Sequence, residues 1–272
     1  MQWRDDRGRL ERPRLLQRLL KPTRADVLVF APHPDDEVIG CGGVIQHALA
    51  EGRRVRVAFT TSGDGYPRAA AKLLMKPESD LTPDDFRRLG ARREAEAIAA
   101  AKVLGLDASQ LAFLRHPDAQ LGKLPAEART SALQGVQRVI EESQPSRVYV
   151  TDHGDEHPDH RVTNELVREA VALAGSVPEV FTYLVHSGGD TRWPLPGPRY
   201  ETSAMDGITY PTGVRWPPPV RVDLTPSESE RKLRALVAHE SQWALDHDYL
   251  ARFVKSEEIF WRVAIQPGSG YK

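Results

Sequence analysis

Two short stretches of the sequence combine histidine with crowded carboxylates. The first is APHPDDEVIGCGG, residues 31–43, which places one histidine and three adjacent acids directly after the apolar run 27–30. The second is TDHGDEHPDH, residues 151–160, which contains three histidines. Like charges this close destabilise one another unless a cation neutralises them, so a divalent metal gives a physical reason for the crowding.

The first stretch offers two ligands at a spacing that suits one ion. A tight turn can bring the imidazole of His33 and the carboxylate of Asp36 toward one point, while Asp35 points elsewhere. One of His157 or His160 would complete the set. A catalytic zinc takes three protein ligands and leaves the fourth position to water, so these residues predict an open hydrolytic site.

The same donor set suits a second metal. Two histidines and one carboxylate also form the facial triad of non-haem iron(II) oxygenases, so Fe²⁺ is the alternative to Zn²⁺. Asp35 favours the hydrolytic interpretation, because a free carboxylate beside the predicted ligands can take a proton from water.

Both stretches follow predicted strands. Apolar runs bounded by turn residues alternate with segments of helical period, which is typical of an α/β fold with helices on both faces of a mostly parallel sheet. Open α/β sheets place their ligands at the carboxyl ends of such strands. The expected strands cover residues 26–30, 54–60, 111–114, 147–151, 180–185, 221–224 and 259–265. One expected helix begins at residue 44, after the glycines, and a second runs from the cap Thr82 to near Gly105. Three more are expected over residues 126–142, 159–174 and 226–244.

The chain is expected to form a single α/β domain over residues 1–272. Residues 1–24 are predicted to be a helical extension. Residues 187–219 are rich in proline, glycine and tryptophan, and they are predicted to form a loop or hairpin that walls the site.

The glycines that follow the first acidic cluster raise the question of nucleotide binding. Gly40, Gly42 and Gly43 allow close approach of the backbone at a helix start. Their spacing fits neither the dinucleotide-binding pattern nor the Walker pattern, so nucleotide binding is not predicted.

Composition argues against several classes of partner. The net charge of −1 implies no global attraction to nucleic acid or to an anionic membrane, so we expect a small-molecule partner. The single cysteine, Cys41, fits a reducing compartment. Neither the apolar core of a signal peptide nor an apolar run of about 18 residues is visible, so we expect a cytoplasmic protein without a transmembrane segment. A homo-oligomer is left open.

The two motifs resemble those of a known family. HPDDE after the first strand, followed much later by HPDH, resembles the N-acetylglucosaminyl-phosphatidylinositol de-N-acetylase family, also called PIG-L or LmbE-like, whose members are zinc-dependent deacetylases of N-acetylglucosamine conjugates. The resemblance covers roughly residues 25–245. Further matches are the loop TSGDG after the second strand, Arg93-x-x-Glu96 leading to Leu104-Gly105, and Lys232 to Leu236 followed by His239-x-Ser241-Gln242.

The resemblance implies a Rossmann-like fold and a role for each residue of the motifs. Zinc would be held by His33, Asp36 and His160. Asp35 would act as general base, and His157 would stabilise the developing oxyanion. The substrate would be an N-acetylated amino sugar. The chemistry of the residues themselves leaves open whether Asp35 or His157 protonates the leaving amine.

Three further residues are candidates for substrate contact. Arg93 lies three residues before Glu96 on a predicted helix, so an ordinary surface ion pair competes with a substrate contact. His186 and Asp190 open the aromatic-rich loop and are predicted to contact the sugar, with a structural role as the alternative. His239 is interpreted as a capping or core residue outside the site.

The remaining alternatives concern the second stretch and the activity itself. His153, Asp155 and Glu156 either orient the ligands or form a solvated loop. A sugar-binding relative without activity would carry the same fold, although the presence of both the ligands and the base argues against it.

Overall fold

The computed structural model describes residues 24–174, 178–187 and 218–265. The helical extension predicted for residues 1–24 and the loop predicted for residues 187–219 lie almost wholly outside the described residues. Asp190 lies outside them as well. Within the described ranges, none of the helices has the length and apolar character needed to span a bilayer.

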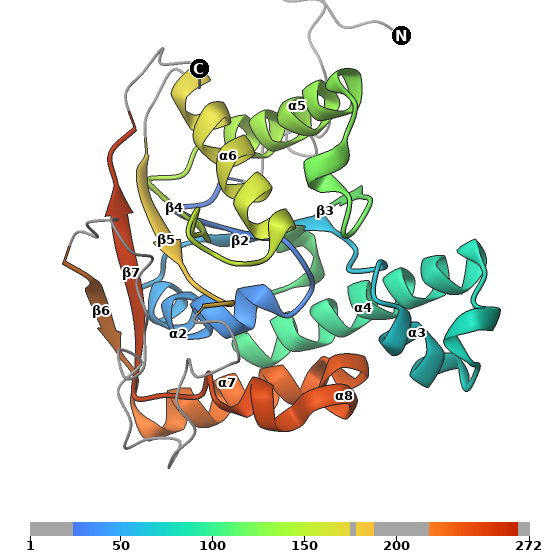
Figure 1. Cartoon of the computed structure of the whole chain (residues 1–272). Coiled ribbons are helices and arrows are strands. Elements are labelled where there is room, and N and C mark those ends of the chain that lie inside the picture. The colour runs from blue at the N-terminus through green and yellow to red at the C-terminus, as the bar shows by residue number, and fades with distance from the viewer. Residues whose placement is uncertain (1–23, 175–177, 188–217, 266–272) are drawn as a thin grey trace, which may run out of the picture.

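A mixed sheet forms the centre of the molecule (Figure 1). In the described part of the chain it has seven strands in the order β3-β2-β1-β4-β5-β7-β6. The first five are parallel, whereas β7 runs antiparallel to both β5 and β6. This confirms the predicted α/β class, and each predicted strand agrees with an observed one to within two residues. The strands are β1 (Val27–Ala31), β2 (Val55–Thr61), β3 (Leu111–His116), β4 (Arg147–Thr151), β5 (Glu179–Tyr183), β6 (Val220–Asp223) and β7 (Glu257–Val263).

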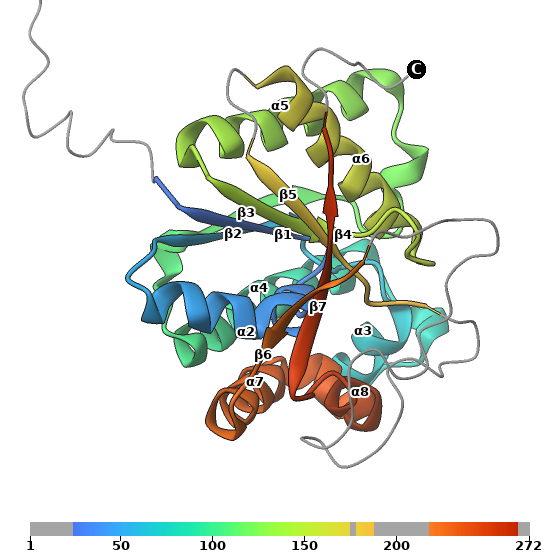
Figure 2. The same cartoon turned by 90° about the vertical axis from the view of Figure 1, so that its left-hand side faces the viewer.

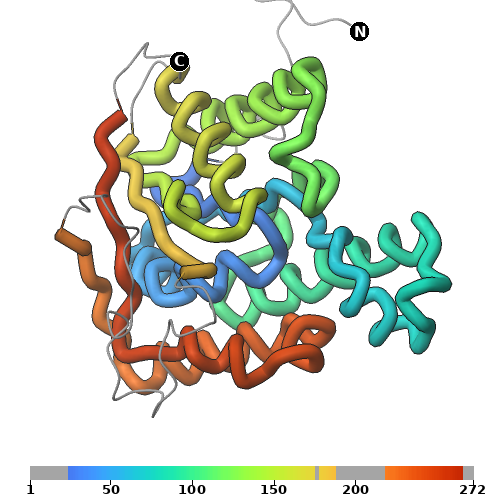
Figure 3. Tube along the Cα trace, in the orientation of Figure 1, coloured from blue at the N-terminus to red at the C-terminus, as the bar shows by residue number. Residues whose placement is uncertain are grey.

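Helices cover both faces of the sheet (Figure 2). On one face lie α2 (Asp36–Ala50), α4 (Pro83–Leu104), α7 (Pro226–Ala238) and α8 (Glu240–Ala251), and on the other lie α5 (Ala126–Ser143) and α6 (Pro158–Leu173). The short α3 (Pro67–Leu74), which the sequence did not predict, projects to one side with the start of α4 (Figure 3). Three 3₁₀ turns complete the described elements: η1 (Glu78–Asp80), η2 (Ala108–Gln110) and η3 (Leu121–Lys123).

The sheet separates two apolar cores. Along β1, Val27 and Val29 pack into the core under α2 and α4, whereas Leu28 and Phe30 pack into the core under α5 and α6. Alternate side chains of a strand point to opposite faces, so a strand buried on both faces must be apolar throughout. This explains why the sequence of β1 is continuously apolar up to the turn that carries the acidic cluster.

The long helix predicted from 82 to 105 is confirmed at both ends. Thr82 caps it, since its hydroxyl accepts the amide N–H of Asp85 and the Asp85 side chain accepts the amide N–H of Thr82. Gly105 ends it with φ 99°, a left-handed conformation that glycine adopts without strain.

The single helix predicted for residues 226–244 is wrong. The structure has two helices, with α7 ending at Ala238, α8 beginning at Glu240, and His239 between them in a non-helical conformation. The reason is tertiary, because the side chain of His239 is fully buried and its Nε2 lies 3.0 Å from Oε1 of Glu37.

The start of α2 also differs from the prediction. The helix begins at Asp36, so the glycines lie inside it instead of preceding it. A Cβ atom at Gly40 would lie 2.1 Å from Cδ2 of Tyr183. Glycine therefore lets this aromatic ring pack directly against the first turns of α2, next to the predicted ligand Asp36.

Gly40→Ala should destabilise the fold by about 1–3 kcal/mol, since the added methyl group cannot fit without moving Tyr183 or α2. Gly135→Ala in α5 is the matched control, because a Cβ there would lie 3.6 Å from Leu114, an ordinary contact. The control should be neutral or stabilise by up to about 1 kcal/mol. Denaturant unfolding measures both, and equal midpoints for Gly40→Ala and the parent would contradict the prediction.

Candidate metal centre

The two histidine-containing stretches meet at one edge of the sheet. β1 and β4 are parallel neighbours, and each is followed at its carboxyl end by one of the stretches. His33 lies in the turn between β1 and α2, and Asp36 is the first residue of α2. His157 caps α6, and His160 lies in its first turn.

Three of the predicted ligand atoms lie at equal distances from one another. Nδ1 of His33, Oδ2 of Asp36 and Nε2 of His160 are separated pairwise by 3.2 Å. Ligands about 2.0–2.1 Å from a tetrahedral zinc ion are about 3.3–3.4 Å apart, so the three atoms match one face of such a site. All three side chains are buried, and His160 is fully enclosed.

The other nitrogen of each histidine faces a carboxylate. Nε2 of His33 lies 3.0 Å from Oδ1 of Asp118, and Nδ1 of His160 lies 3.2 Å from Oδ2 of Asp155. A carboxylate at the second nitrogen favours a proton there, which leaves the lone pair of the first nitrogen free for a metal. Histidines that hold a metal commonly have outer partners of this kind, so the arrangement is compatible with the predicted ligand roles.

Asp155 also ties this site to β5. Its carboxylate accepts amide N–H groups from His157 at 2.9 Å, Val185 at 2.9 Å and His186 at 3.0 Å. It is the buried member of the group His153, Asp155 and Glu156, for which the sequence left two roles open; the other two are exposed. Asp155 thus holds the loop after β4, the end of β5 and the His160 ring in one arrangement.

Burial and charge shift the pKa values of the cluster in opposite directions. Burial disfavours the cationic form of His160, but the carboxylates of Asp155 and Asp36 outweigh it and raise its pKa to about 9. Burial, reinforced by the nearby His33 and His160, lowers the pKa of His157 to about 4. Without a metal, His160 is therefore protonated at neutral pH and His157 is neutral.

Asp35 adopts an unusual backbone conformation beside these ligands. Its φ is 130° and its ψ is −30°, a region that non-glycine residues rarely occupy and that is common at functional sites. Its carboxylate accepts a hydrogen bond from the guanidinium of Arg93 at 3.1 Å. Burial raises the pKa of Asp35 to about 6, with Arg93 opposing the rise, and this value suits a proton acceptor near neutral pH.

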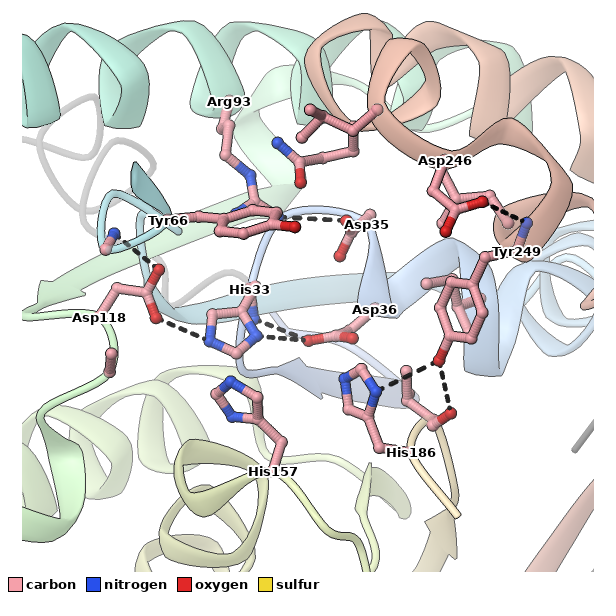
Figure 4. Close-up of a pocket in the computed structure, with 17 residues that line it drawn as sticks. His33, Asp35, Asp36, Tyr66, Arg93, Asp118, His157, His186, Asp246 and Tyr249 are labelled. Carbon is pink, nitrogen blue, oxygen red and sulfur yellow. Dashed lines mark hydrogen bonds and ion pairs between the residues drawn. The ribbon is translucent and has the colours of Figure 1, made fainter. Parts of the chain in front are cut away.

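The site opens into a cavity of about 380 Å³ (Figure 4). His33, Asp35 and Asp36 line it together with His157, and the rings of Tyr66 and Tyr249 also line it, with Tyr249 next to His186. Such a mixture of aromatic walls and convergent polar groups is typical of a small-molecule site.

The predicted substrate-contact residues occupy different positions. Arg93 lines the cavity but is only 4% exposed, and it donates to the carbonyls of Gly63 and Pro34 as well as to Asp35. His186 lines the cavity, with its Nδ1 3.2 Å from the hydroxyl of Tyr249.

Sequence reasoning missed several cavity residues. Asp118 is one, and its second oxygen accepts the amide N–H of Gly65 at 2.7 Å. It follows β3 in the run His116-Pro117-Asp118, so its position after a parallel strand was an available signal. Tyr66 is the residue before α3, which the sequence did not predict, and Tyr249 lies in α8 beyond the predicted helix end at residue 244. Nothing in the local sequence marks either residue as part of the site.

Comparison with known proteins agrees with the two motifs. The family model described as PIG-L, GlcNAc-PI de-N-acetylase, matches residues 28–171, which is more than half of the chain and includes both histidine-containing stretches. A 1D-myo-inositol 2-acetamido-2-deoxy-alpha-D-glucopyranoside deacetylase from Mycobacterium sp. (strain JLS) is 31% identical over 178 residues. That alignment covers 60% of this chain and 56% of the relative, so the chain spans little more than half the length of this protein.

Solved structures share the fold at low sequence identity. A deacetylase of the teicoplanin biosynthesis pathway superposes with a TM-score of 0.64 at 20% identity, covering 89% of this chain and 99% of that one. GalB, the 4-carboxy-2-hydroxymuconate hydratase of Pseudomonas putida KT2440, superposes with a TM-score of 0.61 at 20% identity, covering 90% and 99%. The fold thus supports more than one reaction. The family match across both motifs places this chain in the PIG-L family of GlcNAc-PI de-N-acetylases.

Proposed function

We propose that the chain is a zinc-dependent hydrolase that removes the acetyl group from an N-acetylglucosamine-type sugar or conjugate. The observation that carries this proposal is the triangle of ligand atoms on His33, Asp36 and His160, each 3.2 Å from the others, at a cavity that Asp35 and His157 also line. The mycobacterial relative, named for the deacetylation of a glucosamine-inositol conjugate, supports the substrate class.

The donor set fits zinc. Two imidazole nitrogens and one carboxylate oxygen are ligands that zinc accepts, and their mutual distances suit its tetrahedral geometry. Zinc, when bound, would polarise the acetamide carbonyl and lower the pKa of a water molecule from about 15.7 toward 7.

The chain's own residues supply the remaining chemistry. Asp35 takes the proton of water as the water oxygen attacks the acetamide carbon, and the guanidinium of Arg93 keeps its carboxylate oriented. When the carbon–nitrogen bond breaks, Asp35 returns that proton to the departing amine, and acetate is released. One carboxylate thereby serves as base and then as acid.

His157 is suited to stabilise the developing oxyanion. Its Nδ1 accepts the amide N–H of Asp159 at 3.2 Å, so the neutral ring carries its proton on Nε2. A donor of this kind is worth about 3–4 kcal/mol in acyl transfer. The low pKa of His157 favours this neutral donor over a general acid.

Release of acetate tests the proposal. A panel of N-acetylglucosamine, its disaccharides and its inositol and peptide conjugates is incubated with the zinc-loaded protein, with and without a chelator. We expect acetate from at least one member, loss of release in chelator, and recovery on addition of zinc. Oxygen consumption with Fe²⁺ would favour the oxygenase alternative. Binding of a sugar without release of acetate would favour the non-catalytic alternative, and either result would overturn the proposal.

Zinc binding should strengthen as the pH rises. Because the nearby carboxylates raise the pKa of His160 to about 9 and hold the pKa of His33 well above its usual value without metal, each ring must lose a proton before it can ligate. Below these pKa values each pH unit should weaken the affinity by about tenfold for each of the two protons released. Competition with a chelator of known pH dependence measures this slope. Asp155→Asn removes one of the carboxylates that raise the pKa of His160 and should make the slope shallower, whereas a pH-independent affinity in the parent would contradict the prediction.

A further inference from the structure

The strained backbone of Asp35 is held by a neighbouring carboxylate. Oε2 of Glu37 accepts the amide N–H of Asp35 at 2.9 Å. Glu37 is 1% exposed, so this bond is made away from water. A residue at φ 130° persists only where its surroundings determine its conformation, and Glu37 is the side chain that contacts this amide.

Glu37 is in turn held by His239. Nε2 of His239 lies 3.0 Å from Oε1 of Glu37, and the imidazole is fully buried. Each oxygen of Glu37 therefore has a separate partner. Oε2 binds Asp35 in the turn between β1 and α2, here called the catalytic turn, and Oε1 binds His239 at the corner between α7 and α8. Residues 37 and 239 lie far apart in the sequence, so only the folded chain forms this link.

The corner that carries His239 is itself fixed to α4. The amide and hydroxyl of Ser241 both donate to the carboxylate of Glu96, at 3.0 and 2.7 Å. One turn from Glu96, Arg93 donates to the carbonyl of Pro34 at 2.7 Å and to the carboxylate of Asp35. Both sequence motifs therefore contribute to holding the turn before α2, Arg93 by direct contact and His239 through Glu37.

We propose that Glu37 and His239 are positioning residues that fix the backbone of Asp35 in the conformation that directs its carboxylate toward the reacting water. This inference rests on the proposed function for the role of Asp35. His239, which the sequence placed outside the site, acts on it through Glu37. A purely structural pair would join α2 to the α7–α8 corner without any effect on turnover, and this difference can be measured.

The primary comparison uses two changes at one position. Glu37→Ala removes the acceptor for the Asp35 amide, whereas Glu37→Gln keeps an oxygen that can accept it. For purified, zinc-loaded protein we expect Glu37→Ala to lower kcat about tenfold or more, with KM and zinc stoichiometry unchanged, because a small misplacement of a catalytic group is costly. Glu37→Gln should stay within about threefold of the parent.

The matched control is a histidine–glutamate pair elsewhere. Nε2 of His47 lies 3.1 Å from Oε1 of Glu228, away from the catalytic turn. His47→Ala should leave kcat unchanged. If Glu37→Ala lowers only the unfolding midpoint, with kcat per zinc-loaded molecule equal to the parent, the pair is structural and the inference is overturned. It is also overturned if Glu37→Gln is as defective as Glu37→Ala.

Two further measurements keep the test decisive. If Glu37→Ala does not fold, the same comparison of kcat is made with His239→Gln and His239→Ala. Glutamine retains a donor for Glu37 and alanine does not, so only His239→Ala should lower kcat. Crystal structures of the Glu37 variants separate this inference from the proposed function. Asp35 should keep a positive φ with glutamine and lose it with alanine, whatever the substrate. An unchanged φ in Glu37→Ala overturns the inference, whereas an inactive parent enzyme overturns only the function.

Discussion

Replacing Asp35 with alanine should lower turnover by about 100-fold or more while leaving zinc bound. Asp35 is not one of the three atoms of the ligand triangle, yet it lines the same cavity and its pKa of about 6 suits proton transfer. Its removal takes away the group that accepts the proton of water and returns it to the amine. The predicted ligands His33, Asp36 and His160 remain in place, so the metal content should not change.

Steady-state kinetics on a confirmed substrate, with zinc content measured on the same sample, checks this result. Asp246→Asn is the matched control, because Asp246 lines the cavity mouth but is exposed and contacts no predicted ligand. The control should remain within a few-fold of the parent. Full activity of Asp35→Ala would show that another group is the base, and loss of zinc would show that Asp35 is a ligand.

Replacing His160 with alanine should abolish zinc binding at micromolar concentrations, and activity with it. His160 contributes one corner of the triangle and is fully buried. Its loss leaves two protein ligands, which is fewer than catalytic zinc sites provide. The affinity should fall by more than the 10–100-fold that is typical of losing an outer partner.

Zinc titration against a competing chelator measures the loss. Asp118→Asn is the graded comparison, since Asp118 contacts the far nitrogen of His33 and not the ligand triangle, so it should weaken zinc by about 10–100-fold. Circular dichroism confirms that each variant is folded. Stoichiometric zinc in folded His160→Ala protein would remove His160 from the metal site and with it the main support for the proposed function.

The sequence predicts those parts of the fold that carry their own local signals. β1 is apolar throughout because both of its faces are buried, and α4 has a cap at Thr82 and a glycine at its end. The break at His239 has no such signal, since neither glycine nor proline interrupts the helical pattern. That break results from a contact with Glu37, 202 residues away, and no local periodicity reports a contact of this kind.

In the candidate site, too, some residues carry a signal in the sequence and others do not. Two parallel strands that end in histidine and aspartate motifs predict a meeting point at one sheet edge, and the structure brings His33, Asp36 and His160 together there. Arg93 could be assigned only to an ion pair or a substrate contact, because its partner Asp35 is 58 residues away. The roles of these residues in metal binding and catalysis stay predictions until the variants are measured.

His33 and His160 are separated by 127 residues, yet Nδ1 of one ring lies 3.2 Å from Nε2 of the other. An ion bound by both would act as a removable cross-link between two distant parts of the chain. Closing so long a loop is entropically costly for an unfolded chain, so the ion would be held by the folded chain and released on unfolding. Zinc would then stabilise the folded protein by mass action, so the free energy of unfolding should rise with the zinc concentration.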